Sequence, residues 1–102
     1  MIIKVSKLWG GWAAITIGPV ILTTTLSEAV IRHEKVHVEQ WKKSPILFIP
    51  RYLLDKQYRL RCEIEAYKTS LLHGMSFTTA VQHLLKYKTG ETEEAIIKLL
   101  RG

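Results

Sequence analysis

Short apolar runs broken by glycine and proline fill the first quarter of the chain. The runs are residues 2–7, 12–17 and 20–23. Gly10-Gly11 and Gly18-Pro19 lie between them, where turns are expected. Because many of the apolar positions are β-branched, the runs favour strands over helices. The pattern predicts a small N-terminal β-sheet over about residues 2–23.

After Thr25 the apolar positions recur with helical spacing. Thr25 and Glu28 have the spacing of a capping box, so a first helix is expected over about 26–43. A second helix is expected over about 51–73, between Pro50 and Gly74. The C-terminal helices are expected over 77–87, with Ser76 as the cap, and over 92–101, after a turn at Gly90.

These elements indicate an α+β fold, in which a small sheet is followed by three to four helices. A chain of 102 residues has the usual size of one domain, so residues 1–102 are interpreted as a single domain. The absence of asparagine, together with many lysines and glutamates, is typical of thermophilic proteins. Cys62 is the one cysteine, which excludes an internal disulfide and favours a reducing, cytoplasmic location.

Residues 8–27 carry no charge, which raises the question of a membrane span. Glycines and a proline interrupt this segment, and its β-branched residues favour strands. No membrane span is therefore expected, and no cleavage pattern of a signal peptide is evident.

The first predicted helix places ionisable residues on both of its faces. One face is a solvated surface of alternating charge, made of Glu28, Arg32, Lys35, Glu39 and Lys42. His33, Glu34 and His37 lie on the opposite, packed face beside Val30 and Trp41. Burying a carboxylate without a partner costs several kcal/mol. A bound cation is the simplest compensation.

These three residues form the pattern His-Glu-x-x-His at positions 33–37. Histidines four residues apart on a helix share one face and can bind one Zn²⁺. Glu34 is offset by about a quarter of a turn, so it reaches a water at the metal rather than the metal itself. Glu34 is therefore the predicted general base. Two core histidines held by hydrogen bonds are the alternative interpretation.

Two histidines leave a catalytic zinc site one protein ligand short. The second helix offers Glu63 and Glu65. Glu63 flanks the apolar stripe of that helix. Glu65 points about 200° away from Glu63, and Arg61 and Lys68 are its neighbours on the helix surface. Glu63 is the preferred third ligand. Cys62 points away from Glu63 and is interpreted as a small packing residue.

The two segments 33–37 and 63–67 together resemble the gluzincin metallopeptidases, and in size and layout the archaeal minigluzincins. The second motif of that family reads Glu-x-x-Ala-Asp, and its first glutamate is the third zinc ligand, which matches Glu63. Tyr67 stands where the family has an aspartate that supports a zinc histidine. Its hydroxyl is expected either to take this role or to stabilise the transition state; a core aromatic is the alternative.

The resemblance implies a zinc-dependent endopeptidase that acts on a peptide or protein substrate. Residues 13–22 are the candidate edge strand for binding substrate by strand addition. Residues 90–102 are a candidate cover that keeps a zymogen latent, or else an ordinary packing helix. The candidate donors to the tetrahedral oxyanion are Tyr58, Arg59, Tyr67, His73 and His83.

Two other functions fit parts of the sequence. A non-catalytic scaffold stabilised by zinc would keep His33, His37 and Glu63 but would not need Glu34. A nucleic-acid-binding module would use the net charge of +6 and the eight Lys or Arg between Arg32 and Arg61. Because these cations follow solvated helix faces, no nucleic-acid partner is expected. The sequence does not predict an oligomeric state.

Overall fold

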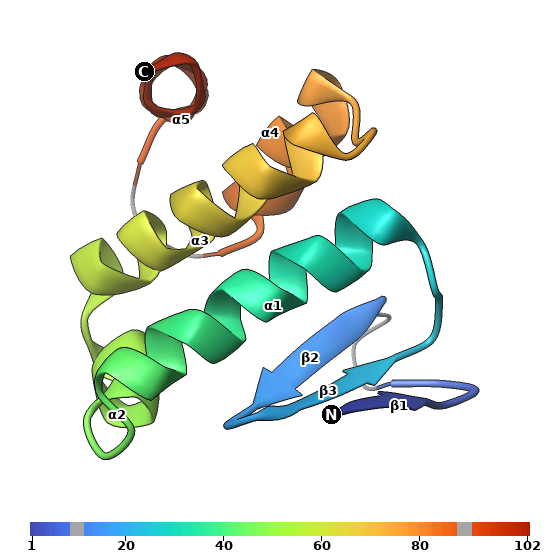
Figure 1. The fold of residues 1–102 in the computed structure, drawn as a ribbon. Coiled ribbons are helices and arrows are strands. Elements are labelled where there is room, and N and C mark those ends of the chain that lie inside the picture. Colours follow the sequence, from blue (N-terminus) through green and yellow to red (C-terminus); the bar gives the residue numbers. More distant parts are fainter. Residues whose placement is uncertain (9–11, 88–90) are drawn as a thin grey trace.

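The computed structural model describes residues 1–8, 12–87 and 91–102 (Figure 1). Within these residues, a three-stranded sheet is followed by five helices, which confirms the predicted α+β class. The strands are β1 (Ile2–Lys4), β2 (Ala14–Ile17) and β3 (Val20–Thr23). The helices are α1 (Glu28–Lys43), α2 (Phe48–Leu54), α3 (Lys56–Leu72), α4 (Phe77–Leu85) and α5 (Glu93–Arg101).

The sheet has the order β1-β3-β2, so β2 is an edge strand. β3 pairs in parallel with β1 and antiparallel with β2. A two-residue loop joins β2 to β3, and Gly18 takes a φ of 59° there, as the first central residue of a type II′ turn requires. The predicted strands were too long, because residues 5–7 and 12–13 lie outside the ladder. The turn expected at Gly10-Gly11 falls outside the described residues.

Helix α1 lies between the sheet and α3 (Figure 1). On the sheet side, the Thr16 hydroxyl donates to the main-chain carbonyl of Glu34 at 3.3 Å. On the α3 side, the Ser70 hydroxyl donates to the carbonyl of Ala29 at 3.1 Å. These two bonds hold α1 in a fixed position between its neighbours, with one stripe facing α3.

The second predicted helix, over 51–73, is in fact two helices. The chain leaves helical geometry at Asp55, which separates α2 from α3. The Asp55 side chain accepts a hydrogen bond from the backbone N–H of Tyr58 at 3.1 Å and so caps α3. Pro50 lies inside α2, where a first-turn position needs no N–H donor. The break lets α2 fold back beside the end of α1.

The capping box predicted at Thr25 and Glu28 does not form. Ser27 is the N-cap of α1, without a side-chain hydrogen bond to the helix. The Thr25 hydroxyl instead accepts from the backbone N–H of Ser27 at 3.1 Å. Such local bonds of threonine compete with helix capping.

The two C-terminal helices pack on α3, and α5 lies on the side of α3 that is remote from α1 (Figure 1). Ser76 and Thr92 cap them, each accepting from the backbone N–H three residues ahead. Their core is a cluster of buried residues from α3, α4 and α5: Leu60, Ile64, Tyr67, Ala80, Val81, Leu84, Ile96 and Leu100. The expected turn at Gly90 falls outside the described residues. No helix in the described part of the chain is long and apolar enough to cross a membrane.

Candidate metal centre

His33 and His37 lie one turn apart on α1 and face Glu63 on α3. His33 Nε2 is 3.3 Å from Glu63 Oε1, and His37 Nε2 is 2.9 Å from Glu63 Oε2. All three residues are buried, Glu63 to 1 % exposure. One ligand atom from each of the three lies within 4.8 Å of the others, so the cluster is able to hold one metal ion.

The hydrogen bonding of the cluster is incomplete without an ion. Glu63 Oε1 is buried and has no hydrogen-bond partner among the described residues. Buried polar atoms in native proteins are nearly always satisfied. Two imidazoles and a carboxylate are also the donor set of many catalytic zinc sites. The residues present therefore fit a metal ion.

Electrostatics tie His37 to Glu63. Burial lowers the pKa of His37, but the adjacent Glu63 carboxylate outweighs it and raises the pKa to about 9. Burial would raise the pKa of Glu63, yet the two histidines hold that pKa well below its usual range. Without a metal, the pair is therefore an imidazolium beside a carboxylate. A cation in the cluster would take over the role of the imidazolium proton.

Gln40 fixes the orientation of His37. Its Oε1 lies 2.8 Å from His37 Nδ1, and its Nε2 donates to the carbonyl of Cys62 at 3.0 Å. A weaker bond runs from the same Nε2 to Glu65 Oε1 at 3.3 Å. Because the amide nitrogen is committed to these acceptors, His37 Nδ1 is the donor to Gln40. This directs the Nε2 of His37 toward Glu63.

Tyr52 reaches the cluster from α2. Its hydroxyl donates a hydrogen bond to Glu63 Oε2, the same oxygen that faces His37. Burial raises the pKa of Tyr52, and the Glu63 carboxylate raises it further, so the hydroxyl stays a donor. The ring stands edge-on to His37 with centroids 6.0 Å apart. Helix α2 is thereby the second wall of the site.

Glu34 lies beside the cluster but is not part of it. The side chain is 5 % exposed, and its Oε2 has no hydrogen-bond partner among the described residues. Burial raises the pKa of Glu34, whereas His37 and His33 lower it in part. An unpartnered carboxylate oxygen with a raised pKa is suited to accept a proton.

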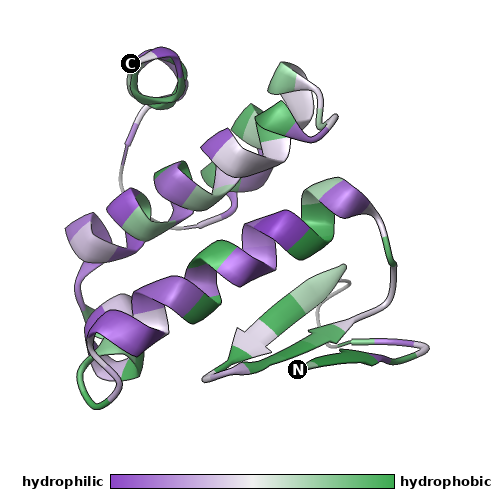
Figure 2. Ribbon diagram, in the orientation of Figure 1, coloured by the Kyte–Doolittle hydropathy of each residue, from purple (hydrophilic) through white to green (hydrophobic). Residues whose placement is uncertain are grey.

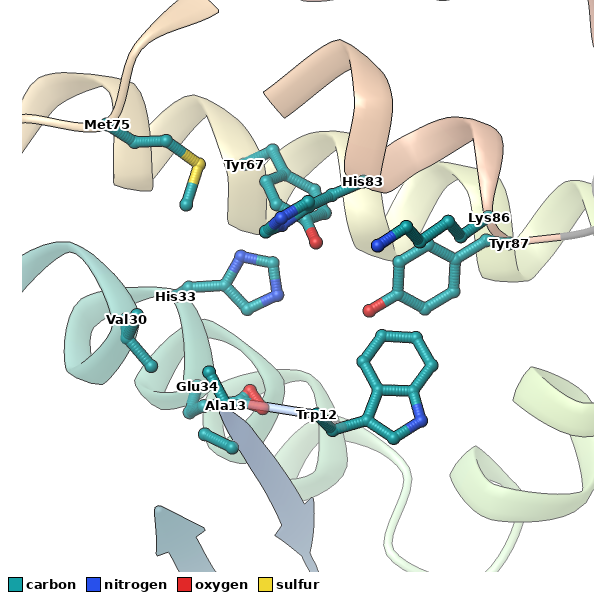
Figure 3. Close-up of a pocket in the computed structure, with 11 residues that line it drawn as sticks. Trp12, Ala13, Val30, His33, Glu34, Tyr67, Met75, His83, Lys86 and Tyr87 are labelled. Atoms are coloured by element: carbon teal, nitrogen blue, oxygen red, sulfur yellow. The ribbon is translucent and has the colours of Figure 1, made fainter. Parts of the chain in front are cut away.

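Two pockets meet at Glu34. The first has a volume of about 260 Å³ and is lined by Trp12, Ala13, Ala14, Val30, His33, Glu34, Tyr67, Met75, His83, Lys86 and Tyr87 (Figure 3). The second has about 530 Å³ and is lined by Trp12, Ala14–Ile17, Glu34, His37, Phe48, Ile49, Tyr52, Leu53, Glu63 and Tyr87. Trp12 and Tyr87 border both pockets, with their ring centroids 5.4 Å apart. This aromatic pair and Glu34 are therefore shared by the two pockets.

Tyr67 lies against the cluster in a different way from the one predicted. Its ring stands edge-on to His33 at a centroid distance of 4.3 Å, while His33 Nδ1 has no hydrogen-bond partner in the described chain. The residue is 4 % exposed and belongs to the α3–α4–α5 core. Tyr67 thus contacts His33 of the candidate metal cluster by packing. A role for its hydroxyl in the transition state stays a prediction.

Of the other predicted oxyanion donors, His83 borders the site, whereas Tyr58, Arg59 and His73 line neither pocket. His83 lines the first pocket together with Glu34. Arg59 donates to the main-chain carbonyls of Tyr52 and Leu53 at the end of α2, and the Tyr58 ring packs against Arg51. His73 is the exposed C-cap of α3.

Glu63, Glu65 and Cys62 are neighbours in sequence, but only Glu63 belongs to the candidate metal cluster. Glu63 faces the histidines, whereas Glu65 is exposed. Cys62 is buried outside the cluster, and burial raises the pKa of its thiol to about 11. It is a packing residue, as the sequence predicts.

The predicted substrate strand borders the candidate site, whereas the predicted C-terminal cover does not. All four residues of β2 line the second pocket, so the edge strand borders the site, while β3 is central in the sheet. Helix α5 packs on α3 instead, with Ile96 and Leu100 buried there. No described residue of 91–102 lines either pocket. The C-terminal helix is thus the packing helix of the alternative interpretation.

Sequence reasoning missed Gln40, Tyr52, Trp12 and Tyr87. Gln40 was open to prediction, because it lies three residues after His37 on the same helix face. Tyr52 was not, because its position depends on the break at Asp55. Trp12 and Tyr87 meet only through the tertiary fold.

Comparison of the chain with protein-family profiles, with curated proteins and with solved structures finds no match.

Proposed function

We propose that the protein is a zinc-dependent endopeptidase of the gluzincin type, with His33, His37 and Glu63 as zinc ligands and Glu34 as general base. The observation that carries the proposal is the position of Glu34. It is a buried carboxylate with a free oxygen, next to a three-residue metal cluster and at the junction of two pockets. A purely structural metal site has no use for such a group.

The ligand set supports zinc over the other common metals. Two imidazoles and one carboxylate are the protein ligands of many hydrolytic zinc sites, which leave the fourth position open. Magnesium and calcium prefer sites built from oxygen atoms alone. In the described chain the cluster has three members, so the site is open rather than closed.

The chain's own residues supply the remaining steps of hydrolysis. When bound, zinc lowers the pKa of a water molecule and polarises the scissile carbonyl. Glu34 Oε2 accepts the proton of the attacking water and passes it to the leaving amine. The Tyr52 hydroxyl holds the Glu63 carboxylate in place throughout. The unpaired edge of β2 orients an extended peptide beside the site.

The two competing functions have less support. A zinc-stabilised scaffold is expected to close its site with a fourth ligand, and Glu34 has no role in it. For nucleic-acid binding, two of the four cations of α1 are already paired on its solvated face: Arg32 pairs with Glu28 at 2.7 Å and Lys42 with Glu39 at 3.2 Å.

The test combines zinc stoichiometry with proteolysis. Elemental analysis is expected to give one zinc per chain in the wild type and in Glu34→Gln, and none in Glu63→Ala. Cleavage of a quenched peptide library is expected in the wild type and at least about a hundredfold slower in Glu34→Gln. Glu94→Gln is the matched control, because Glu94 is exposed on α5 and lines neither pocket. Zinc uptake with equal cleavage by Glu34→Gln would reject the mechanism, and failure to bind zinc would reject the function.

A further inference from the structure

Large apolar side chains project into solvent around α2. They are Ile46 at 86 % exposure, Leu47 at 65 %, Ile49 at 43 %, Leu53 at 62 % and Leu54 at 85 %. All five fall within nine consecutive residues. We call them the α2 apolar patch. Contiguous exposed apolar surface of this kind marks an interaction site.

The patch is a consequence of how α2 is attached. Phe48 is the buried residue of this seven-residue helix, and Tyr52 points inward to Glu63. Phe48 and Tyr52 attach one face of α2 to the candidate metal site. The other face has nothing to pack against within the described chain, yet it carries leucine and isoleucine instead of polar residues.

Exposed cations surround the patch. They are Lys43 at the end of α1, Arg51 on α2 and Lys56 at the start of α3, while the neighbouring Lys42 pairs with Glu39. Asp55 is the one acidic residue in the segment 42–56; it caps α3 and lies 4.0 Å from Arg51. In Figure 2 the hydrophilic end of α1 and the hydrophobic loop that leads into α2 lie together at one corner of the molecule. The whole chain carries a net charge of +6.

We propose that the α2 apolar patch docks on the surface of an anionic lipid bilayer. The leucines and isoleucines enter the boundary between headgroups and acyl chains, and the surrounding cations meet lipid phosphates. This is a peripheral contact, made by a short helix lying on the surface.

Charge argues against a second copy of the chain as the occupant. A two-fold interface would bring the same patch on both subunits together. The cations around the patch of one copy would then lie close to those of the other copy, at a cost in free energy. An anionic surface turns the same charges into an attraction.

Docking in this orientation places the larger pocket near the bilayer. Ile49 and Leu53 belong both to the patch and to the lining of the 530 Å³ pocket. If the proposed function holds, a polypeptide segment close to the membrane surface has the shortest path to the site. The docking itself depends neither on zinc nor on catalysis, so the test below is independent of both.

The test measures sedimentation of the metal-free protein with vesicles. Binding is expected to vesicles of phosphatidylcholine and phosphatidylglycerol, to fall with added salt, and to be weak for phosphatidylcholine alone. Leu54→Gln is expected to lower the partition coefficient by about five- to tenfold, because one inserted leucine is lost. Leu72→Gln is the matched control, since Leu72 is 83 % exposed at the far end of α3. Lys43→Gln is expected to lower binding by about fivefold, and Lys98→Gln on α5 by less.

Three results would overturn the proposal. The first is no binding to anionic vesicles at low salt. The second is an equal loss for Leu54→Gln and Leu72→Gln, which would reduce the effect to general hydrophobicity. The third is a dimer in sedimentation equilibrium that Leu54→Gln dissociates, which would make a second copy the occupant. Circular dichroism of each variant establishes that the fold is retained.

Discussion

His37 donates from Nδ1 to Oε1 of Gln40 over 2.8 Å, while its Nε2 faces Glu63 at 2.9 Å. The first bond assigns the ring nitrogens: with Nδ1 as the donor, Nε2 becomes the metal-binding atom once it loses its proton. Gln40 is itself anchored to the carbonyl of Cys62 on α3. The side-chain amide of Gln40 therefore links the rotamer of His37 on α1 to α3, the helix that carries Glu63.

Replacing Gln40 is expected to weaken metal binding without removing a ligand. Gln40→Met keeps the length of the side chain but cannot orient His37, and loss of such a partner typically lowers metal affinity by about ten- to a hundredfold. Competition with a chromogenic chelator measures the zinc dissociation constant. The exposed Gln82→Met is the control and should leave it unchanged. Equal affinities in both variants would show that Gln40 does not support the site.

Metal-free stability should depend on pH through His37. The pKa of His37 is raised from 6.5 to about 9 in the folded protein, so its protonated form stabilises the fold. That contribution is complete below pH 6.5 and is lost as the pH rises through 9, with a slope of up to about 1.4 kcal/mol per pH unit. Glu63, whose pKa is lowered, loses its contribution only at acidic pH.

Urea unfolding of the metal-free protein at several pH values checks this trend. His37→Gln should flatten it between pH 6.5 and 9. Zinc binding must displace the same proton, so calorimetry in buffers of different ionisation enthalpy should show release of about one proton per zinc near neutral pH. Binding without proton release would mean that His37 is neutral in the metal-free protein.

Tyr52→Phe is expected to destabilise the metal-free protein. The variant removes the tyrosine donor to Glu63 and leaves His37 as the partner of that oxygen, and hydrogen bonds to charged groups are worth about 2 kcal/mol. Tyr58→Phe is a suitable control, because the Tyr58 ring lies under Arg51, away from the metal cluster, and its loss should cost less than about 1 kcal/mol. Thermal unfolding of the three proteins measures the difference. A similar loss in both variants would contradict a specific role for Tyr52.

The cluster of His33, His37 and Glu63 was predictable because it depends on local geometry. His33 and His37 share a helix face whatever the rest of the chain does, and the apolar stripe of α3 orients Glu63 toward them. Tyr52 depends on a helix break that propensity alone does not reveal. Asp55 ends α2 and caps α3, although the residues on both sides favour a helix. The contact of Trp12 with Tyr87 joins distant segments, and no local pattern encodes it.

The C-terminal helix is expected to stabilise the fold without covering the candidate site. Ile96 is fully buried in the core of α3, α4 and α5, on the face of α3 remote from α1. Ile96→Ala should therefore lower the free energy of unfolding by about 3 kcal/mol, through lost burial and a cavity. Leu99→Ala on the same helix removes a side chain that is 42 % exposed and should cost less than about 1 kcal/mol. If α5 instead held the enzyme latent, Ile96→Ala would raise peptide cleavage above the wild-type rate at temperatures where the variant stays folded. The position of α5 predicts an unchanged rate there.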